Sequence, residues 1–156
     1  MKKYELTDET KRFYGRTLHR IVAIRSFGYI SKGKEGGWIE KEENLSHEGN
    51  CWVDQDAYVY DDAEIRNNAK ILDKAQIFNN AVVSNNALIF DETQIYGNAL
   101  VGDNTKTKGN TEISGFVDIS GNIKIINAKI SSNEDYIVFK NWWSSGRYFT
   151  WTRSNN

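Results

Sequence analysis

The sequence predicts an all-β fold of short stacked strands, and three regularities between Cys51 and Asn127 predict it. A large aliphatic residue recurs at every sixth position, a small or short side chain precedes it by two positions, and Asp, Asn, Gly or Gln follows it by two. Six residues turn an α-helix by about 600°, so a helix would scatter these apolar positions around its surface. The aliphatic positions are Val53, Val59, Ile65, Ile71, Ile77, Val83, Ile89, Ile95, Val101, Ile113, Ile119 and Ile125, with Thr107 as the exception.

Each six-residue unit is interpreted as one short strand followed by a corner. The aliphatic side chain points inward and its two neighbours point outward, because side chains alternate along a strand. Asn, Asp and Gly suit the corners because they tolerate left-handed backbone conformations. Such units bury their apolar faces only against their neighbours, so the repeat predicts a solenoid.

The units Ile65–Lys70, Ile71–Gln76, Ile77–Val82, Val83–Leu88 and Ile95–Leu100 read IRNNAK, ILDKAQ, IFNNAV, VSNNAL and IYGNAL. They resemble the hexapeptide-repeat family of left-handed parallel β-helices. The resemblance implies a triangular prism in which three units make one coil of eighteen residues, about four coils in this chain. Toward the end one residue is missing, so we expect Ile126–Ile130 to form a final, distorted rung.

We expect three parts: an N-terminal cap at 1–50, the β-helix at 51–130 and an aromatic C-terminal hairpin at 131–156. Both ends of a β-helix expose strand edges, which need covering. Short strands are expected in the N-terminal cap, with a turn at Gly15 and a glycine-rich loop at Gly33–Gly37. The strands of this cap are expected at Lys3–Leu6, Phe13–Tyr14 and Leu18–Ile24.

The C-terminal segment is unusually aromatic. Two strands, Tyr136–Phe139 and Tyr148–Thr152, are expected around the turn Ser144–Gly146. Trp142, Trp143, Tyr148, Phe149 and Trp151 lie within ten residues of one another. So many large rings need a surface to pack on, which could be the prism, a second copy or another protein.

The outward positions predict an external aromatic ladder. Residues eighteen apart stack on one face of an eighteen-residue coil, which places Tyr60, Phe78 and Tyr96 in one column. Leu72 and Phe90 form an apolar neighbour, and the third face is expected to be mostly polar. Three alternatives could cover the ladder: the caps folding back, a second copy or a different protein. Each predicts burial of Phe78 and Phe90. The candidate interface residues are Tyr60, Leu72, Phe78, Phe90, Tyr96, Trp142, Trp143, Tyr148 and Trp151.

Charge is distributed unevenly, although the net charge is only −1. Residues 1–34 carry a balance of +6, residues 35–105 one of −10, and residues 106–156 one of +3. One interpretation is a solvated surface between charged caps. The alternative is an acidic flank that docks on a basic partner or mimics nucleic acid. Binding of nucleic acid itself is not expected.

No catalytic residue, cofactor or metal site is predicted. Many hexapeptide-repeat proteins are acyltransferases, which use a histidine base between the subunits of a trimer and bind coenzyme A along the coils. Here the two histidines, His19 and His47, both precede the repeats, and no long loop interrupts the coils. Two histidines are too few for the three-histidine zinc site of related carbonic anhydrases. The segment Gly33–Gly37 (GKEGG) lacks the Lys-Ser/Thr of a phosphate-binding loop.

The remaining signals predict a cytoplasmic protein. No stretch approaches the roughly 20 apolar residues that a membrane span needs, and no signal peptide is visible. The single cysteine, Cys51, occupies a small inward position and is interpreted as a core residue.

The N-terminal runs KYELTDET, LHRI and GGWIEKEENLSHEGNCWV resemble small uncharacterised proteins of phages and prophages. Some of those proteins continue past this chain's end, so a truncated form is one alternative. The resulting hypothesis is a non-enzymatic binding or assembly module that docks on a protein in the cytosol of its bacterial host, and inhibition of a defence system is its sharpest form. The alternatives are an acyltransferase-like enzyme and a purely structural homo-oligomer.

Overall fold

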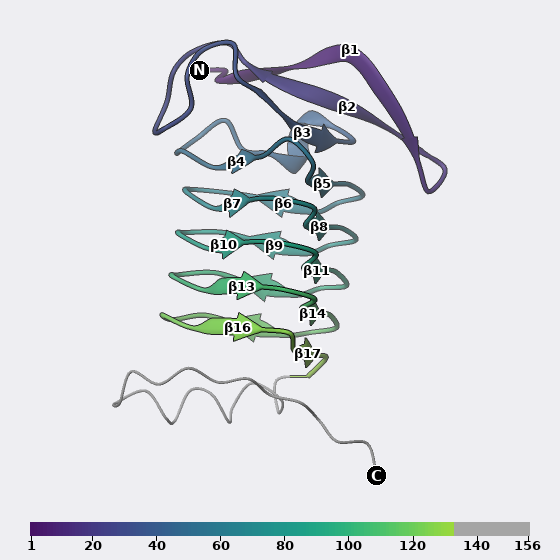
Figure 1. Ribbon diagram of the computed structural model, residues 1–156, viewed down its shortest axis with the longest axis vertical. Helices are drawn as coiled ribbons and strands as arrows, with labels where there is room; N and C mark the ends of the chain where they lie inside the picture. The colour runs from purple at the N-terminus through teal and green to yellow at the C-terminus, as the bar shows by residue number, and fades with distance from the viewer. Residues whose placement is uncertain (133–156) are drawn as a thin grey trace.

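The computed structural model describes residues 1–132, in which a parallel β-solenoid of about five turns follows an antiparallel N-terminal hairpin (Figure 1). This confirms the predicted fold class, an all-β left-handed parallel β-helix. Among these residues the one helical element is a short 3-10 turn, η1 (Glu42–Asn44). Three sheets make the sides of the prism, and successive turns of the chain supply successive strands to each of them.

The first sheet has eight strands and the other two have five and four. In spatial order the first sheet contains β1 (Tyr4–Phe13), β2 (Arg16–Ala23), β3 (Glu35–Ile39), β5 (Tyr58–Val59), β8 (Gln76–Ile77), β11 (Gln94–Ile95), β14 (Glu112–Ile113) and β17 (Lys129–Ile130). The second sheet contains β16 (Lys124–Ile126), β13 (Lys106–Lys108), β10 (Leu88–Ile89), β7 (Lys70–Ile71) and β4 (Trp52–Val53). The third sheet contains β15 (Asp118–Ile119), β12 (Leu100–Val101), β9 (Val82–Val83) and β6 (Glu64–Ile65).

The pairing register confirms the coil of eighteen residues. Ile95 pairs with Ile77 above it and with Ile113 below it, so equivalent positions stack directly. The exception is the last rung, where Ile113 pairs with Ile130, one residue early. The missing residue that the sequence indicates is therefore absorbed between β16 and β17.

The corners explain the recurrence of Asn and Asp. Eight of these residues, all at corner positions, have positive φ angles between 49° and 59°. Their side chains also bond between turns: Asn67 Nδ2 donates to Asn85 Oδ1 at 2.8 Å, and Asn85 Nδ2 donates to Asp103 Oδ1 at 3.0 Å. The same residue type thus satisfies the backbone conformation and links one turn to the next. The eight residues are Asp61, Asn67, Asp73, Asn79, Asn85, Asp91, Asp103 and Asn127.

The interior of the prism contains the predicted aliphatic and small residues, nearly all inaccessible to solvent. Three buried threonine hydroxyls, those of Thr93, Thr105 and Thr107, have no hydrogen-bond partner among the described residues. A buried, unpaired hydroxyl costs free energy because it loses its hydrogen bonds to water. These hydroxyls, all between β10 and β14, therefore lower the stability of this part of the core.

Replacing Thr107 with valine should raise the free energy of unfolding by about 1–2 kcal/mol, because valine keeps the shape and removes the unpaired hydroxyl. Urea denaturation measures the change. The matched control is Thr111→Val, which should lower stability because the Thr111 hydroxyl donates to the Lys108 carbonyl at 2.8 Å. If both variants lose stability equally, the Thr107 hydroxyl has a partner.

The solenoid begins before the six-residue repeat does. β3 pairs in parallel with β5, and Leu45 forms a parallel bridge with Ile65. These two segments precede the predicted coils and complete a further turn with β4, the first strand of the repeat, which is why about five turns form instead of about four. The glycine-rich segment was expected to be a loop, which is wrong for Gly36 and Gly37. Both lie in β3, where the close approach of β4 leaves no room for a side chain.

The N-terminal cap is a hairpin and a loop that fold over two of the three sheets. β1 and β2 are longer than expected, because β1 continues without a break from Tyr4 to Phe13, and they join at Tyr14–Gly15. The loop at 24–34 covers the upper end of the second sheet, where the Phe27 ring lies 5.6 Å from that of Trp52. Trp52 points outward from the prism and is nevertheless completely buried.

Cys51 is buried, as predicted, and burial raises the pKa of its thiol. Lys3 is also fully buried, and its Nζ donates to the Cys51 carbonyl at 2.9 Å and to the Gly49 carbonyl at 3.3 Å. Burial lowers the pKa of Lys3. Lys3 thus donates hydrogen bonds to backbone carbonyl groups just before β4, and the carbonyl group of the buried Cys51 needs such a donor.

Candidate protein-binding surface

The predicted aromatic ladder is present on the first sheet. The rings of Tyr60 and Phe78 lie 5.1 Å apart at an interplanar angle of 3°, and those of Phe78 and Tyr96 lie 4.8 Å apart at 8°. The three residues directly follow β5, β8 and β11, so the register of the coils spaces the rings one strand apart. Stacked pairs of this kind add about 0.5–1.5 kcal/mol each beyond the burial of their surface.

The hairpin covers the upper end of this ladder. Phe13 stacks on Tyr58 at 4.6 Å and meets Tyr60 edge-on at 5.6 Å. Tyr60 is only 4% exposed, and burial raises the pKa of its phenol to about 12. The alternative that a cap folds back therefore holds for Tyr60, which contacts this chain's own hairpin.

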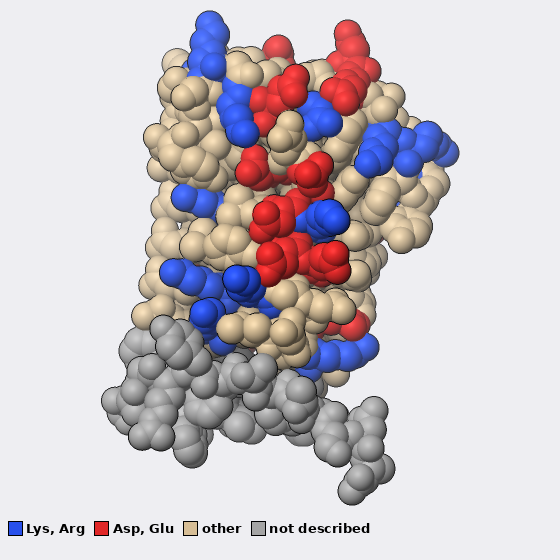
Figure 2. All heavy atoms as spheres, in the orientation of Figure 1, with Lys and Arg blue, Asp and Glu red and all other residues tan. Residues whose placement is uncertain are grey.

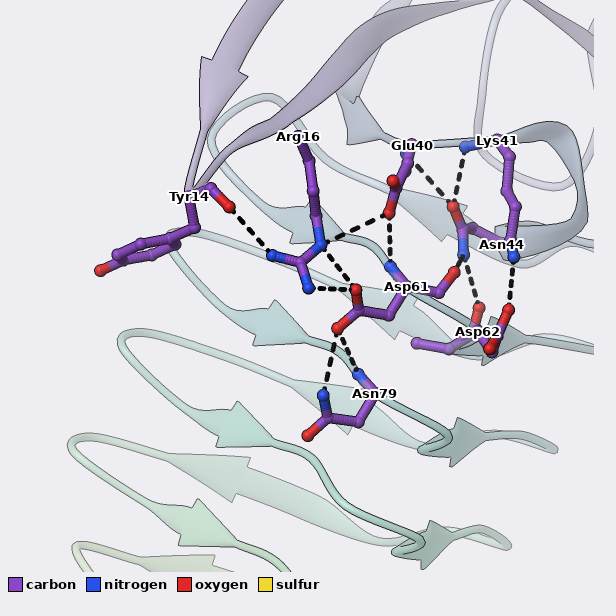
Figure 3. A network of polar contacts seen from close by, with 9 residues as sticks. Tyr14, Arg16, Glu40, Lys41, Asn44, Asp61, Asp62 and Asn79 are labelled. Atoms are coloured by element: carbon purple, nitrogen blue, oxygen red, sulfur yellow. Dashed lines mark hydrogen bonds and ion pairs between the residues drawn. The ribbon is translucent and has the colours of Figure 1, made fainter.

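A polar cluster holds the tip of the hairpin against the solenoid (Figure 3). Arg16 Nε donates to Asp61 Oδ1 at 2.5 Å and lies 3.7 Å from Glu40 Oε2. The Arg16 guanidinium also lies 5.1 Å from the centre of the Tyr60 ring. Figure 3 shows the Arg16 side chain reaching from the hairpin to Asp61 and Glu40, while the Tyr14 ring points away. The cluster therefore fixes the hairpin over the ladder.

Asp61 connects this cluster to the turn below. Its backbone N–H donates to Glu40 Oε2 at 2.7 Å. Its Oδ2 accepts from the backbone and side-chain nitrogens of Asn79 at 3.2 and 3.1 Å. Asp61 has a φ of 59°, so a conformation typical of a corner also presents this carboxylate to two neighbouring turns.

Two basic side chains, one on β1 and one on β2, attach the strands of the hairpin to the solenoid. Lys11 Nζ donates to the Tyr58 hydroxyl at 2.6 Å and lies 5.5 Å from the centre of the Trp38 ring. The Arg20 guanidinium lies 4.3 Å from the same ring and pairs with Glu9 at 2.8 Å. Contacts of a cation with a ring face are worth about 0.5–2 kcal/mol, depending on solvent access.

The ladder continues below the hairpin. Phe78 and Tyr96 are half-buried, and the Tyr96 hydroxyl donates to Glu112. Lys129 Nζ lies 3.0 Å from the same Glu112 carboxylate. The Tyr96 hydrogen bond, followed by that of Lys129, holds the pKa of Glu112 below its usual range. The lower ring is thus hydrogen-bonded to one member of an ion pair.

Two large apolar residues that follow strands of the first sheet are exposed, one at a corner and one on the adjoining third sheet. Phe116 is 79% exposed and occupies the corner between β14 and β15, where the turns above have Asn98 and Asn80. Leu100, at the start of β12, is 45% exposed on the adjoining third sheet. We call Phe78, Tyr96, Leu100 and Phe116 the lower corner surface.

The sequence interpretation did not include Leu100 or Phe116, and Leu100 is an apolar exception on the third face, which was expected to be mostly polar. Leu100 stands one position before an inward aliphatic residue, Val101. The predicted columns of outward residues were built from the position directly after each inward residue, so they did not include Leu100. Phe116 had a visible signal, because an aromatic residue replaces the Asn of two earlier corners. An exposed aromatic residue at a corner has no packing role in the prism, which makes it a candidate for binding.

Leu72 and Phe90 lie apart from the ladder. They follow β7 and β10 of the second sheet and are half-buried, as Phe78 is. Asp73, Asp91 and Glu92 line the corner that separates them from the first sheet. Figure 2 shows acidic side chains gathered along the middle of this view, with lysines and arginines on both sides. Trp142, Trp143, Tyr148 and Trp151 lie outside the described residues.

Some of these acidic side chains form hydrogen bonds with the backbone at the corners of neighbouring turns. Asp73 Oδ2 accepts the backbone N–H of Asp91 at 3.1 Å, and Asp91 Oδ2 accepts that of Gly109 at 2.8 Å. These carboxylates therefore link successive turns, as the asparagines do at another corner.

Both histidines make contacts within the N-terminal cap. His47 Nε2 lies 2.6 Å from Glu42 Oε1, and its ring stacks on Tyr4 with centroids 4.4 Å apart. His19 Nδ1 lies 3.4 Å from the Thr7 carbonyl oxygen. In the described part of the chain, no group of three or more His, Cys, Asp and Glu residues is arranged to hold a metal ion. Within the same residues, no helix is long and apolar enough to cross a membrane.

Comparison with known proteins places the repeat in context. No protein-family model matches the chain. It is 37% identical over 79 residues to the uncharacterized acetyltransferase YdcK of Escherichia coli (strain K12), a match that covers 45% of this chain and 24% of YdcK. The chain thus spans about a quarter of the length of that curated relative. The solenoid and this relative together fit the hexapeptide-repeat β-helix family.

Proposed function

We propose that the protein is a non-enzymatic binding module whose lower corner surface docks a protein partner. The observation that carries the proposal is the exposure of Phe116 and Leu100, which follow β14 and β11 of the sheet that carries the aromatic stack. A stack fixed by coil register loses little conformational entropy on binding, and aromatic residues dominate the energetic centres of interfaces.

The charges around this surface are suited to specificity. Glu112 and Lys129 lie beside Tyr96 as an ion pair, so a partner that covers the ring meets both signs of charge. Polar residues at the rim of an interface set orientation and association rate more than affinity. The apolar residues would supply most of the binding free energy, and this ion pair would set the orientation of the partner.

The partner to seek first is a cytosolic protein of a bacterial host. The motivation is the resemblance of the N-terminal runs to phage and prophage proteins. Inhibition of a host defence protein is the specific form of this proposal. It predicts that the partner, once purified, loses activity when the chain binds.

We expect Phe78→Ala combined with Tyr96→Ala to weaken binding of a purified partner more than tenfold, which corresponds to about 1.4 kcal/mol. Tenfold is a conservative expectation, because two stacked rings leave the interface. Titration calorimetry measures the affinity, with the partner first captured from bacterial lysate. Since Phe78 is half-buried, a second variant, Leu100→Ser with Phe116→Ser, tests the same surface without touching the core.

The matched control is Leu72→Ala with Phe90→Ala on the second sheet. It should leave the affinity within about twofold, because these residues lie across the acidic corner from the ladder. If the control abolishes binding and the lower-corner variants do not, the interface is on the second sheet. If neither changes the affinity, the proposed surface is wrong.

The second candidate is an acyltransferase-like enzyme, which the similarity to the uncharacterized acetyltransferase YdcK favours. Acetyl-coenzyme A would then raise the melting temperature of the chain, and transfer of the acetyl group would depend on His19 or His47. Thermal shift with acetyl-coenzyme A, and with coenzyme A as the comparison, tests this directly. No shift at millimolar ligand counts against the enzyme.

A further inference from the structure

We propose that β1 pairs in antiparallel fashion with β1 of a second copy, centred on Thr10, and joins two solenoids end to end. The first sheet ends at β1, where Tyr4–Leu6 and Thr10–Phe13 pair with β2 and no strand pairs on the other side among the described residues. Figure 1 shows β1 at the end of the stack, with no described strand beyond it. An exposed strand edge presents unpaired backbone donors and acceptors, which a second strand can satisfy.

Only half of this edge is regular. The register between β1 and β2 shifts between Leu6 and Thr10, and the Glu9 N–H donates to Thr7 Oγ1 at 3.3 Å. From Thr10 to Phe13 the pairing with β2 is regular. Because the bulge lies on one side of Thr10, pairing centred there sets the bulged half of each β1 against the regular half of the other copy.

The order of charges along β1 is complementary to itself. Asp8 and Glu9 precede Thr10, and Lys11 and Arg12 follow it. Antiparallel pairing centred on Thr10 places Asp8 opposite Arg12 of the second copy and Glu9 opposite its Lys11. Opposite charges in directly facing positions stabilise a strand pair, and like charges destabilise it.

Neighbouring registers lack this match. Along the free edge of β1, the backbone N–H and C=O groups of every second residue point away from β2. Two residues that face each other across the dimer must therefore both have odd numbers or both have even numbers. The centre of the pairing can then lie on Thr10 or on a neighbouring residue, but not between two residues. Moving it by one residue places Glu9 opposite Glu9 or Lys11 opposite Lys11. The charge pattern therefore selects one register and a two-fold symmetric dimer.

Asp8 and Arg12 carry the contact, because among the described residues neither makes an ion pair or a contact with a ring, whereas Glu9 and Lys11 do. Glu9 pairs with Arg20 at 2.8 Å, and Lys11 donates to Tyr58 at 2.6 Å. Asp8 and Arg12 are exposed, and Arg12 donates to Thr17 Oγ1 at 2.9 Å. The proposal goes beyond the proposed function, since this edge lies at the cap and the lower corner surface lies several turns away.

A cysteine at the centre of the pair tests the register. In the proposed dimer the two Thr10→Cys residues face each other with Cα atoms about 4.5–5.5 Å apart, within the range of a disulfide. The native Cys51 is buried, so the new thiol is the reactive one. Under mild oxidation Thr10→Cys should become a covalent dimer, and the exposed control Thr17→Cys on β2 should remain monomeric. Equal cross-linking of both variants overturns the proposal, as does none.

Charge exchange tests the contact without a covalent bond. We expect Asp8→Arg or Arg12→Asp alone to weaken self-association about tenfold, because each places two like-charged pairs across the interface. The double variant restores both pairs and should recover dimerisation in sedimentation equilibrium. A wild-type chain that stays monomeric over the concentration series, or a double variant as weak as the single ones, overturns the proposal.

Discussion

Replacing Asn44 with alanine should lower the free energy of unfolding by about 3–5 kcal/mol, the largest loss expected from a polar side chain here. Asn44 is fully buried. Its Oδ1 accepts the backbone N–H groups of Glu40 and Lys41 at 3.2 and 2.9 Å. Its Nδ2 donates to the carbonyls of Asp61 and Ala63 at 3.0 and 2.8 Å. Alanine would leave all four backbone groups without this partner.

The control for Asn44 is the same change at an exposed corner. Asn80→Ala removes one side-chain contact, from Asn80 Nδ2 to Asn98 Oδ1 at 3.2 Å, and should cost less than about 0.5 kcal/mol. Chemical denaturation of both variants measures the difference. A loss at Asn44 no larger than the loss at Asn80 would mean that water replaces the amide, and that this part of the cap is open to solvent.

Replacing Gly37 with alanine should cost about 3 kcal/mol or more, because the added methyl group meets backbone that cannot move aside. A Cβ at Gly37 would lie 2.3 Å from the Asp54 carbonyl oxygen and 2.6 Å from that of Ala57. Gly37 does not have a positive φ, so the cost is steric. β3 also carries Trp38, the ring beneath Lys11 and Arg20, so its displacement should loosen the hairpin.

Gly102→Ala is the matched control, since Gly102 also lacks a positive φ. A Cβ there would approach the Ser84 hydroxyl at 3.2 Å, a contact that a small side-chain adjustment relieves. We expect a change of less than about 1 kcal/mol, measured by thermal unfolding beside Gly37→Ala. In the Gly37 variant, Tyr60 should also become more accessible to solvent, which its fluorescence or hydrogen exchange nearby would report. Equal stability of the two glycine variants would contradict the close packing of β3 on β4.

The sequence predicted the repeated part of the fold because the residues that specify each strand and corner lie close together in the chain. An inward aliphatic residue, a small residue at the corner and an Asx or Gly turn recur within six residues, so every unit specifies its own strand and corner. The ladder of Tyr60, Phe78 and Tyr96 followed from the same arithmetic, because vertical neighbours are eighteen residues apart. The final rung at Ile130 was also predictable, since the missing residue is visible in the spacing.

The cap was less predictable because its contacts join residues far apart in sequence. Gly36 and Gly37 look like a loop in isolation, and only the approach of β4 explains why glycine is needed inside a strand. Trp52, Tyr58 and Tyr60 occupy outward positions, and nothing near them in sequence shows that Phe27 and Phe13 cover them.

The sequence by itself determined the periodic part of this protein: the strands, the corners, the interior and the column of stacked rings. The reason is that a solenoid repeats one local conformation, so each residue's role depends on its place within six. Only the tertiary structure decided which outward residues remain open to solvent. The hairpin, held by Arg16 on Asp61, buries Tyr60, while Leu100 and Phe116 stay exposed. Exposure depends on what packs against a residue from elsewhere in the chain, and no local pattern contains that information.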